Sequence, residues 1–214
     1  INASLSAYQH AVKIAPGNSD AWLLLAKMAF QYDKKDLARD SLANTQTALG
    51  TLTAGEQYNL AVNLPSALLQ EPSSGYVLPD IFNIYPRPKL TIFMHPESQA
   101  AYQLSLPTVS EGGRVILRTS IGMSPESWSQ EGDGVTFSVQ IRIGAIDTLL
   151  NNIYTMSINP KENLEERRWL PVEIDLTPWA GEEVTLIMAT SAGPVGDERY
   201  DWAGWGNPAI IVQP

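Results

Sequence analysis

The sequence predicts an α+β protein in two parts, a helical segment followed by an antiparallel β-sandwich of jelly-roll type. Apolar residues recur at helical spacing through the first third of the chain, whereas in the rest they alternate with polar residues, as in strands that bury one face. Between these regions, residues 70–75 are Gln-Glu-Pro-Ser-Ser-Gly, a composition typical of a loop. We therefore expect a helical part over residues 1–72 and a sandwich over residues 73–214.

Helical periodicity predicts successive helices in the first part. The first covers residues 3–14 and ends before Pro16-Gly17, and Asn18-Ser19-Asp20 supplies capping oxygens for the second. Asp33-Lys34-Lys35 separates the second helix from a third, and residues 53–69 are expected to form one more. The residues expected on the packing faces of the first three helices are Ala7, Tyr8, Ala11, Val12, Ala15, Trp22, Leu25, Ala26, Ala29, Phe30, Leu37, Ala38, Ser41, Leu42 and Thr45.

Small and large residues of this part also stand at fixed offsets from one another. These residues are Tyr8, Ala11, Pro16, Trp22, Leu25, Ala26 and Ala38. Their spacing resembles the tetratricopeptide repeat, which has a period of about 34 residues. The second repeat departs from the pattern at Leu42, Thr45 and Gly50. The resemblance implies that the signature residues pack helix on helix, and that a groove for a protein partner is incomplete with fewer than three repeats.

The second part contains eight predicted strands separated by turn residues. In residues 135–143 every odd position is apolar and every even position is polar, and residues 172–176 repeat this alternation. The predicted strands are Lys89–Met94, Ala101–Leu106, Arg114–Ile121, Val135–Ile143, Asn152–Ser157, Leu170–Leu176, Glu183–Thr190 and Ala209–Val212. Short strands of this number favour an antiparallel sandwich or jelly roll.

Three local patterns stand out in this second part. They are residues 132–139 (Gly-Asp-Gly-Val-Thr-Phe-Ser-Val), residues 169–181 with Asp-Leu at the strand end and Trp-Ala-Gly after it, and residues 200–208 (Tyr-Asp-Trp-Ala-Gly-Trp-Gly-Asn-Pro). In order and spacing they resemble the galactose-binding-like sandwich superfamily, especially its carbohydrate-binding modules. The resemblance implies the sandwich fold, and it implies sugar binding as one function that such a fold carries.

Charge and composition exclude several classes of function. The net charge is −9, and residues 73–214 carry almost all of it. An acidic surface repels both the phosphates of nucleic acids and anionic membranes, so we expect neither as a partner. The chain has no cysteine, which excludes disulfides and thiolate chemistry. No stretch is long and apolar enough for a membrane helix.

No catalytic constellation is recognisable, so we expect a protein that is not an enzyme. The adjacent pairs Glu165-Glu166 and Glu182-Glu183 carry no sign of facing a common cleft, as glycoside hydrolysis requires. His10 and His95 lie in different parts without ligand-spaced partners. Gly112-Gly113 lacks the lysine of a phosphate-binding loop.

No cofactor is expected. The resemblance leaves a structural calcium open, because galactose-binding-like sandwiches often hold one in a loop at one edge. The loop residues with suitable oxygens are Asp133, Asp197, Glu198 and Asp201. Since they lack EF-hand spacing, we assign no metal ligands.

The candidate binding site consists of Trp128, Asp133, Asp201 and Trp202. Two turns supply these residues, and both are rich in the aromatic rings and carboxylates that sugar sites use. In the topology of the resembled superfamily such turns meet at one end of the sandwich, where a weak sugar site is expected. Trp205 is expected inside the core, because it enters the last strand.

We therefore expect a non-catalytic binding region of a larger bacterial protein linked to surface glycans. The alternative is a scaffold for a protein partner, with no sugar ligand. A groove with an exposed tryptophan and a nearby Asp or Asn favours the first, and a broad apolar patch favours the second. The chain opens at Ile1, so we expect further sequence upstream. O-antigen polymerase or ligase-like membrane proteins carry similar tails, which makes an extracytoplasmic location the expectation and leaves a cytoplasmic one open.

Overall fold

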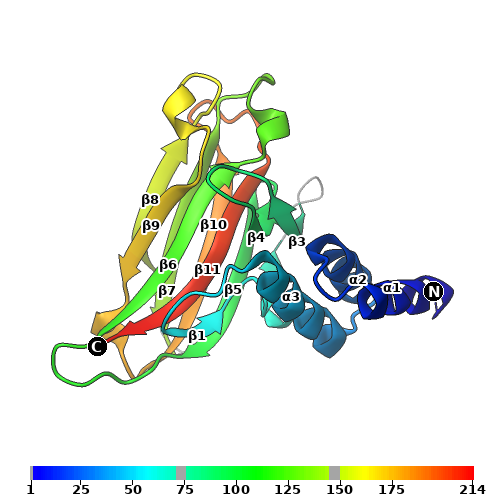
Figure 1. Ribbon diagram of the computed structural model, residues 1–214. Helices are drawn as coiled ribbons and strands as arrows, with labels where there is room; N and C mark the ends of the chain where they lie inside the picture. The colour runs from blue at the N-terminus through cyan, green and yellow to red at the C-terminus, as the bar shows by residue number, and fades with distance from the viewer. Residues whose placement is uncertain (1, 71–75, 145–149) are drawn as a thin grey trace.

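Three helices stand at one side of a two-layered β-sandwich in a computed structural model that describes residues 2–70, 76–144 and 150–214 (Figure 1). The helices are α1 (Asn2–Ile14), α2 (Ser19–Gln31) and α3 (Lys35–Leu49), in the positions that the periodicity predicts. None of the described helices is long and apolar enough to cross a membrane. Residues 71–75 of the expected linker lie outside the described residues.

Local sequence explains where the helices begin and end. The side-chain oxygen of Asn18 accepts a hydrogen bond from the amide of Ala21 at 3.0 Å, which satisfies one free donor of the first turn of α2. Helix α3 ends at Gly50, whose φ of 62° is left-handed and costs glycine nothing sterically.

The prediction of a further helix over residues 53–69 is wrong. Two short strands, β1 (Glu56–Asn59) and β2 (Leu68–Gln70), lie there instead and pair with strands near the far end of the chain and in mid-chain. Gly55 has a φ of 76°, and a Cβ at this position would lie 2.7 Å from the carbonyl oxygen of Val212. The amide of Leu60 donates to the carbonyl of Pro208 at 2.8 Å. Long-range pairing therefore overrides the helical spacing of the apolar residues.

The eight predicted strands are all present; most ends shift by three residues or fewer, but the last strand begins at Ala203 and not at Ala209. The remaining described strands are β3 (Val77–Phe82), β4 (Lys89–Met94), β5 (Ser98–Ser105), β6 (Arg114–Met123), β7 (Val135–Ile143), β8 (Asn151–Ile158), β9 (Leu170–Asp175), β10 (Glu183–Ala192) and β11 (Ala203–Gln213). Beyond residue 50, the helical turns of the described residues are three-residue 3₁₀ turns, as the predicted sandwich requires.

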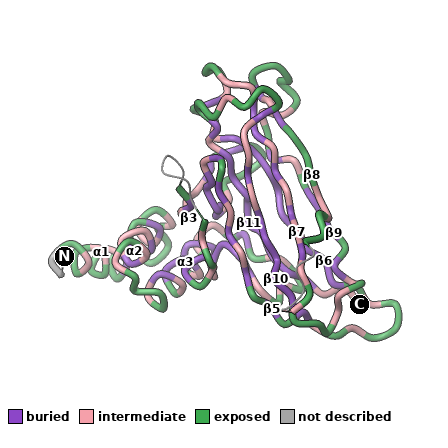
Figure 2. The backbone as a smooth tube through the Cα atoms, turned by 180° about the vertical axis from the view of Figure 1, so that it is seen from behind, coloured by how far each residue is buried: buried purple, intermediate pink, exposed green. Residues whose placement is uncertain are grey.

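Two antiparallel sheets form the sandwich. Sheet A has the order β3-β4-β11-β6-β9, with β1 also paired to β11, and sheet B has the order β2-β5-β10-β7-β8. Strand β7 shows why they pack: its odd-numbered residues from Val135 to Ile141 are buried and its even-numbered residues are not. Figure 2 shows the buried residues running along the facing strands.

Trp205 lies in the core, as predicted. Its side chain is 0% exposed, and its ring meets Phe137 edge-on with the ring centroids 5.0 Å apart. The helices share this core, because Leu23, Ala26 and Leu42 belong to the same buried apolar cluster as Trp205. The helices and the sandwich therefore pack as one body.

A buried polar junction also ties the helices to sheet A. Asn207 of β11 donates to the carbonyl of Thr51 at 2.8 Å. Its side-chain oxygen accepts hydrogen bonds from Gln46 of α3 and Asn59 of β1, both at 3.2 Å. At the edge of the sheet, Lys27 of α2 pairs with Asp80 of β3 at 2.8 Å.

Candidate functional site

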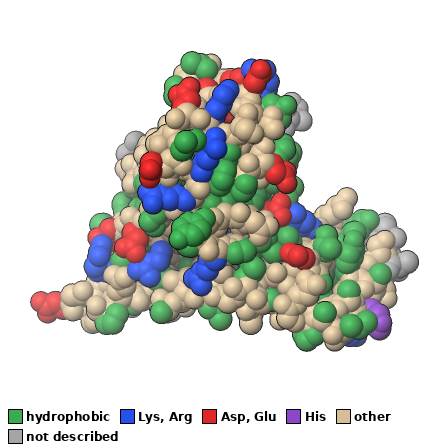
Figure 3. All heavy atoms as spheres, turned by 45° about the horizontal axis from the view of Figure 1, so that its top comes forward, with side chains coloured by type: hydrophobic (Ala, Val, Ile, Leu, Met, Phe, Trp, Pro, Cys, Tyr) green, Lys and Arg blue, Asp and Glu red, His purple; other side chains and the backbone are tan. Residues whose placement is uncertain are grey.

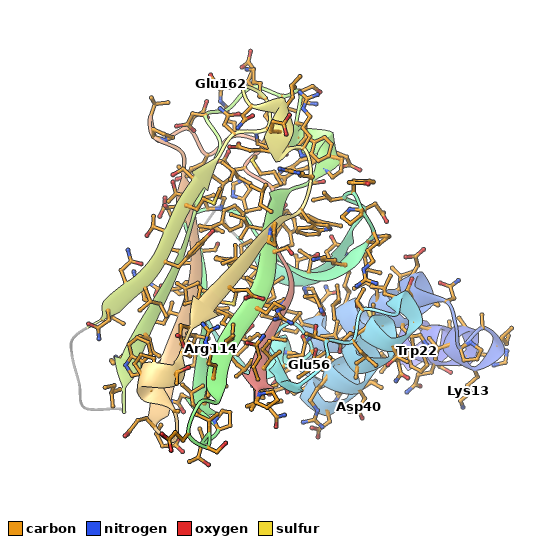
Figure 4. The ribbon with its side chains drawn as sticks, turned by 60° about the vertical axis from the view of Figure 1, so that its left-hand side comes forward. Lys13, Trp22, Asp40, Glu56, Arg114 and Glu162 are labelled. Atoms are coloured by element: carbon orange, nitrogen blue, oxygen red, sulfur yellow. The ribbon has the colours of Figure 1, made fainter. Side chains whose placement is uncertain are left out.

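The structure brings the two predicted turns together at one end of the sandwich. The amide of Ser124 donates to the carbonyl of Trp202 at 2.8 Å, and Arg199 pairs with Glu131 at 2.9 Å. Gly132 makes this approach feasible, since a Cβ there would lie 2.7 Å from the carbonyl oxygen of Arg199. Glu162, labelled in Figure 4, marks the same end of the molecule.

The four predicted site residues nevertheless have different environments. Asp201 is completely buried, so its carboxylate has no surface to offer a ligand. Trp128 is half-buried, and its indole N–H donates to the carbonyl of Met123 at 2.9 Å. Asp133 accepts a hydrogen bond from the amide of Val195 at 2.5 Å. Trp202 is the member of this set that lines an open cleft, and the candidate site therefore moves to that cleft.

The two aspartates form a second feature, an unbalanced pair of carboxylates beneath the turns. Both side-chain oxygens of Asp201 and Oδ1 of Asp133 are buried without a hydrogen-bond partner in the described residues. Burial, and after it the charge of Asp133, raises the pKa of Asp201 to about 8. At neutral pH the Asp201 carboxyl therefore holds a proton for much of the time.

Oxygens of this kind suit a hard cation such as Ca²⁺. Asp133 and Asp201 would hold it, and its charge would compensate theirs and tie the two turns together. However, no cluster of three or more His, Cys, Asp or Glu side chains suited to a metal occurs within the described ranges. Backbone carbonyls or water would have to complete the coordination.

The cleft that Trp202 lines is called here the aromatic cleft. It has a volume of about 480 Å³ and lies between β3, β4 and the turn over residues 124–126. Its lining residues are Tyr76, Asp80, Ile81, Phe82, Asn83, Phe93, Ser124, Pro125, Glu126 and Trp202. Aromatic rings thus stand beside two carboxylates and one amide.

The rings of the aromatic cleft support one another. Tyr76 meets Phe93 edge-on at 5.2 Å between ring centroids, and Phe93 lies 5.6 Å from Phe82. Gly204 of β11 lets the Phe82 ring lie against the sheet, because a Cβ there would come within 2.6 Å of that ring. Tyr76 remains 39% exposed, and Trp202 is half-buried, so both present ring surface to a ligand.

Some polar side chains of the aromatic cleft already form hydrogen bonds within the protein, and others are open to solvent. Asp80 accepts hydrogen bonds from Lys27 Nζ and from the amide of Ile81, both at 2.8 Å. Asn83 and Glu126 are exposed. Asp80 is therefore held in place by its partners, while Asn83 and Glu126 are open to new hydrogen bonds.

Sequence reasoning missed most of this cleft because it missed strand β3. Pro79 interrupts the apolar run of β3, and proline is tolerated there because β3 is an edge strand of sheet A. The burial of Val77, Pro79 and Phe82 becomes visible only in the structure, because the sequence of β3 does not alternate apolar with polar residues.

The comparisons with known proteins give distant likenesses. No family model matches the chain. An uncharacterised protein of Archaeoglobus fulgidus is 37% identical over an alignment of 153 residues, and the match covers 67% of this chain and 37% of that protein. The chain thus spans little more than a third of the length of this relative.

Solved structures that resemble the sandwich include carbohydrate-binding modules. A family 51 module from Clostridium perfringens, in complex with methyl-galactose, is 12% identical with a TM-score of 0.42 and covers 67% of this chain and 92% of that one. A tandem family 22 module from Paenibacillus barcinonensis is 10% identical with a TM-score of 0.41 and covers 67% and 40%. A third, described as a carbohydrate-binding module of the β-sandwich superfamily, is 9% identical with a TM-score of 0.46 and covers 77% and 64%.

Proposed function

We propose that this chain is a non-catalytic binding region and that it holds a carbohydrate in the aromatic cleft. The observation that carries the proposal is the position of Trp202 and Tyr76, whose partly exposed rings lie in one cleft with Asn83 and Glu126. A groove with an exposed tryptophan and nearby amide or carboxylate groups is the arrangement that favours a sugar over a protein partner.

The chemistry of the cleft suits a neutral sugar. The C–H face of a pyranose packs against an aromatic ring, while carboxylate and amide oxygens accept hydrogen bonds from its hydroxyls. A ring contact contributes about 1 kcal/mol, and each net hydrogen bond adds a similar amount. We therefore expect a dissociation constant in the millimolar to high micromolar range, or about −4 to −6 kcal/mol.

Titration of a broad oligosaccharide panel into the whole chain tests this proposal. Tryptophan fluorescence and amide chemical shifts report binding, and Trp202→Ala and Tyr76→Ala should each weaken it about fivefold, as expected for the loss of about 1 kcal/mol. Tyr85→Ala is the matched control, because Tyr85 is 76% exposed and does not line the cleft. A panel without any response, or an equal loss in Tyr85→Ala, would remove the carbohydrate proposal.

The second candidate function is a scaffold for a protein partner. Ile14 of α1 and Leu24 of α2 are 71% and 47% exposed, so the helices present apolar surface. The tetratricopeptide-like register of these helices is compatible with such a role. Replacement of both residues by serine should abolish partner capture on this surface and leave the sugar response unchanged.

We also propose that this region belongs to a larger extracytoplasmic protein linked to surface glycans. The Archaeoglobus fulgidus relative is much longer than the matched stretch, which supports the larger size alone. The gene sequence upstream of Ile1 tests this proposal: membrane spans or a signal sequence agree with it, and a cytoplasmic enzyme domain contradicts it.

A further inference from the structure

A second cleft, here called the basic cleft, lies over the outer face of sheet A. It has a volume of about 310 Å³ and is bounded by the loop after α3 and by strands β4, β6, β9 and β11. Its charged residues are Arg87, Lys89, Arg118 and Glu173. Three cations and one carboxylate thus line a cleft in a protein whose net charge is −9. Figure 3 shows that Lys and Arg side chains stand among Asp and Glu side chains on the visible face of the molecule.

The cations of the basic cleft are not balanced by the protein. Arg118 donates through Nε to Glu173 at 2.6 Å, and its two Nη groups have no hydrogen-bond partner in the described part of the chain. Lys89 donates to the hydroxyl of Ser120 at 2.6 Å, and neither Lys89 nor Arg87 forms an ion pair with any described residue. Two positive charges therefore share the cleft without a counterion.

Lys89 is held in position by an aromatic ring, but its charge has no counterion among the described residues. Its Nζ lies 5.4 Å from the ring centroid of Trp169, a cation–π contact. Gly206 leaves room for this pair, because a Cβ there would lie 2.7 Å from the Trp169 ring and 3.1 Å from Lys89 Cδ. Burial, and after it the charge of Arg87, lowers the pKa of Lys89 to about 8. A bound anion would offset the positive charge of Arg87 and stabilise the charged form of Lys89.

We propose that the basic cleft binds an oxyanion, a carboxylate or phosphate carried by a small polar molecule such as an acidic sugar. Arg87 and the free Nη groups of Arg118 donate hydrogen bonds to the anion, since a guanidinium fork matches the geometry of carboxylate and phosphate oxygens. Lys89 adds a point charge. The hydroxyls of Thr53 and Ser120, which also line the cleft, face the neutral part of the molecule. This site is separate from the aromatic cleft and does not depend on it.

Calorimetric and NMR titrations of the whole chain at low ionic strength test the proposal. The probes are glucuronate, inorganic phosphate and, as the neutral control, glucose. Glucuronate, phosphate or both should bind, and glucose should leave the residues of the basic cleft unshifted. The stronger of the two anionic probes identifies whether the natural group is a carboxylate or a phosphate.

Variants locate the anion. Arg87→Gln should weaken anion binding about tenfold, equivalent to about 1.4 kcal/mol. The matched control is Arg114→Gln, because Arg114 lies on the same strand as Arg118, pairs with Asp175 at 3.3 Å, and stands outside the cleft (Figure 4). Its affinity should stay within about twofold of the parent. Thermal unfolding confirms that both variants are folded.

Three results would overturn the proposal. They are the absence of a response to both anionic probes, equal losses in the Arg87→Gln and Arg114→Gln variants, and binding of glucose at the same residues. Equal losses of affinity in the two variants would mean that the anion is attracted by the net positive charge of this sheet face and does not bind in the cleft.

Discussion

The aromatic cleft and the basic cleft lie on the outer face of the same sheet. They differ in whether their charged side chains have a partner of opposite charge within the protein. Strand β4 runs beneath both, because Lys89 and Phe93 are an even number of residues apart and point to the same side. In the aromatic cleft the carboxylate of Asp80 is already paired with Lys27, and ring surface remains open. In the basic cleft the positive charges of Arg87 and Lys89 remain unpaired. The difference indicates that one cleft selects by shape and the other by charge.

The largest expected effect comes from Trp205, which lies in the core between the two sheets and lines neither cleft. Trp205→Ala should lower the free energy of unfolding by about 3 to 5 kcal/mol, because a completely buried aromatic side chain is lost. Urea denaturation measures the change. Tyr85→Ala, which removes an exposed ring, should change stability by less than about 0.5 kcal/mol. A loss in Trp205→Ala as small as this would contradict the position of the ring in the core.

Asp133 and Asp201, which lie close together beneath the turns, should make the stability of the protein depend on pH. The pKa of Asp201 is about 8 in the folded protein and near 3.8 when unfolded, so the folded state binds the proton more tightly between these values. Stability should therefore fall as pH rises through this window, with a limit of about 1.4 kcal/mol per pH unit. Between pH 6 and pH 8 we expect a loss of about 2 kcal/mol in EDTA.

The Asp201→Asn variant should lack this dependence, because an amide does not titrate. Chemical denaturation at pH 6 and pH 8 compares the two proteins. Parallel pH profiles for the parent and Asp201→Asn would assign the effect to other groups. Added Ca²⁺ should stabilise the parent more than the variant if the pair holds the cation.

The affinity of the basic cleft for an oxyanion should depend on pH near the pKa of Lys89, which is about 8. Lys89 carries its charge below a pKa of about 8, and the other charged side chains that line the cleft are Arg87, Arg118 and Glu173. Oxyanion affinity should therefore fall about threefold to tenfold between pH 7 and pH 9. Lys89→Gln should flatten this profile. The affinity of the aromatic cleft for sugar should stay constant between pH 7 and pH 9. An equal fall in sugar affinity would contradict the proposal that the two clefts bind ligands of different charge.

The smallest expected effect concerns the ion pair at the edge of the aromatic cleft. Lys27→Met removes the partner of Asp80, and both side chains are about one third exposed. The free energy of unfolding should change by less than about 1 kcal/mol. Because Asp80 then becomes free to accept from a ligand, sugar affinity should shift by less than about threefold. Fluorescence titration detects the shift, and oxyanion affinity serves as the control.

The sequence alone predicts those elements whose pattern is local. Strand β7 shows strict alternation, and α2 has both a cap at Asn18 and an apolar stripe, so both were predicted close to their observed bounds. Strands β1 and β2 could not be found this way. Their residues carry helical spacing, and it is pairing with β11 and β5 that makes them strands.

The candidate site was predictable only as a location. Turn residues indicated one end of the sandwich, where the structure does bring the two turns together, and Trp202 lines a cleft there. Composition could not distinguish Asp201, which the structure buries, from Glu126, which it exposes. The basic cleft was not predicted, because Arg87, Lys89 and Arg118 lie on a segment and two strands that meet only through β11.

The position of β11 in the middle of sheet A also determines when the protein can fold during synthesis. This strand pairs with β1, β4 and β6, and Glu56 of β1 stands opposite Ile211. Every other strand of the sheet leaves the ribosome before β11 does. Until β11 has been synthesised, we expect sheet A to remain incomplete and the helices to lack the sheet against which they pack. Contacts of such long range make folding slow, and the apolar faces of β4 and β6 are exposed to chaperones meanwhile.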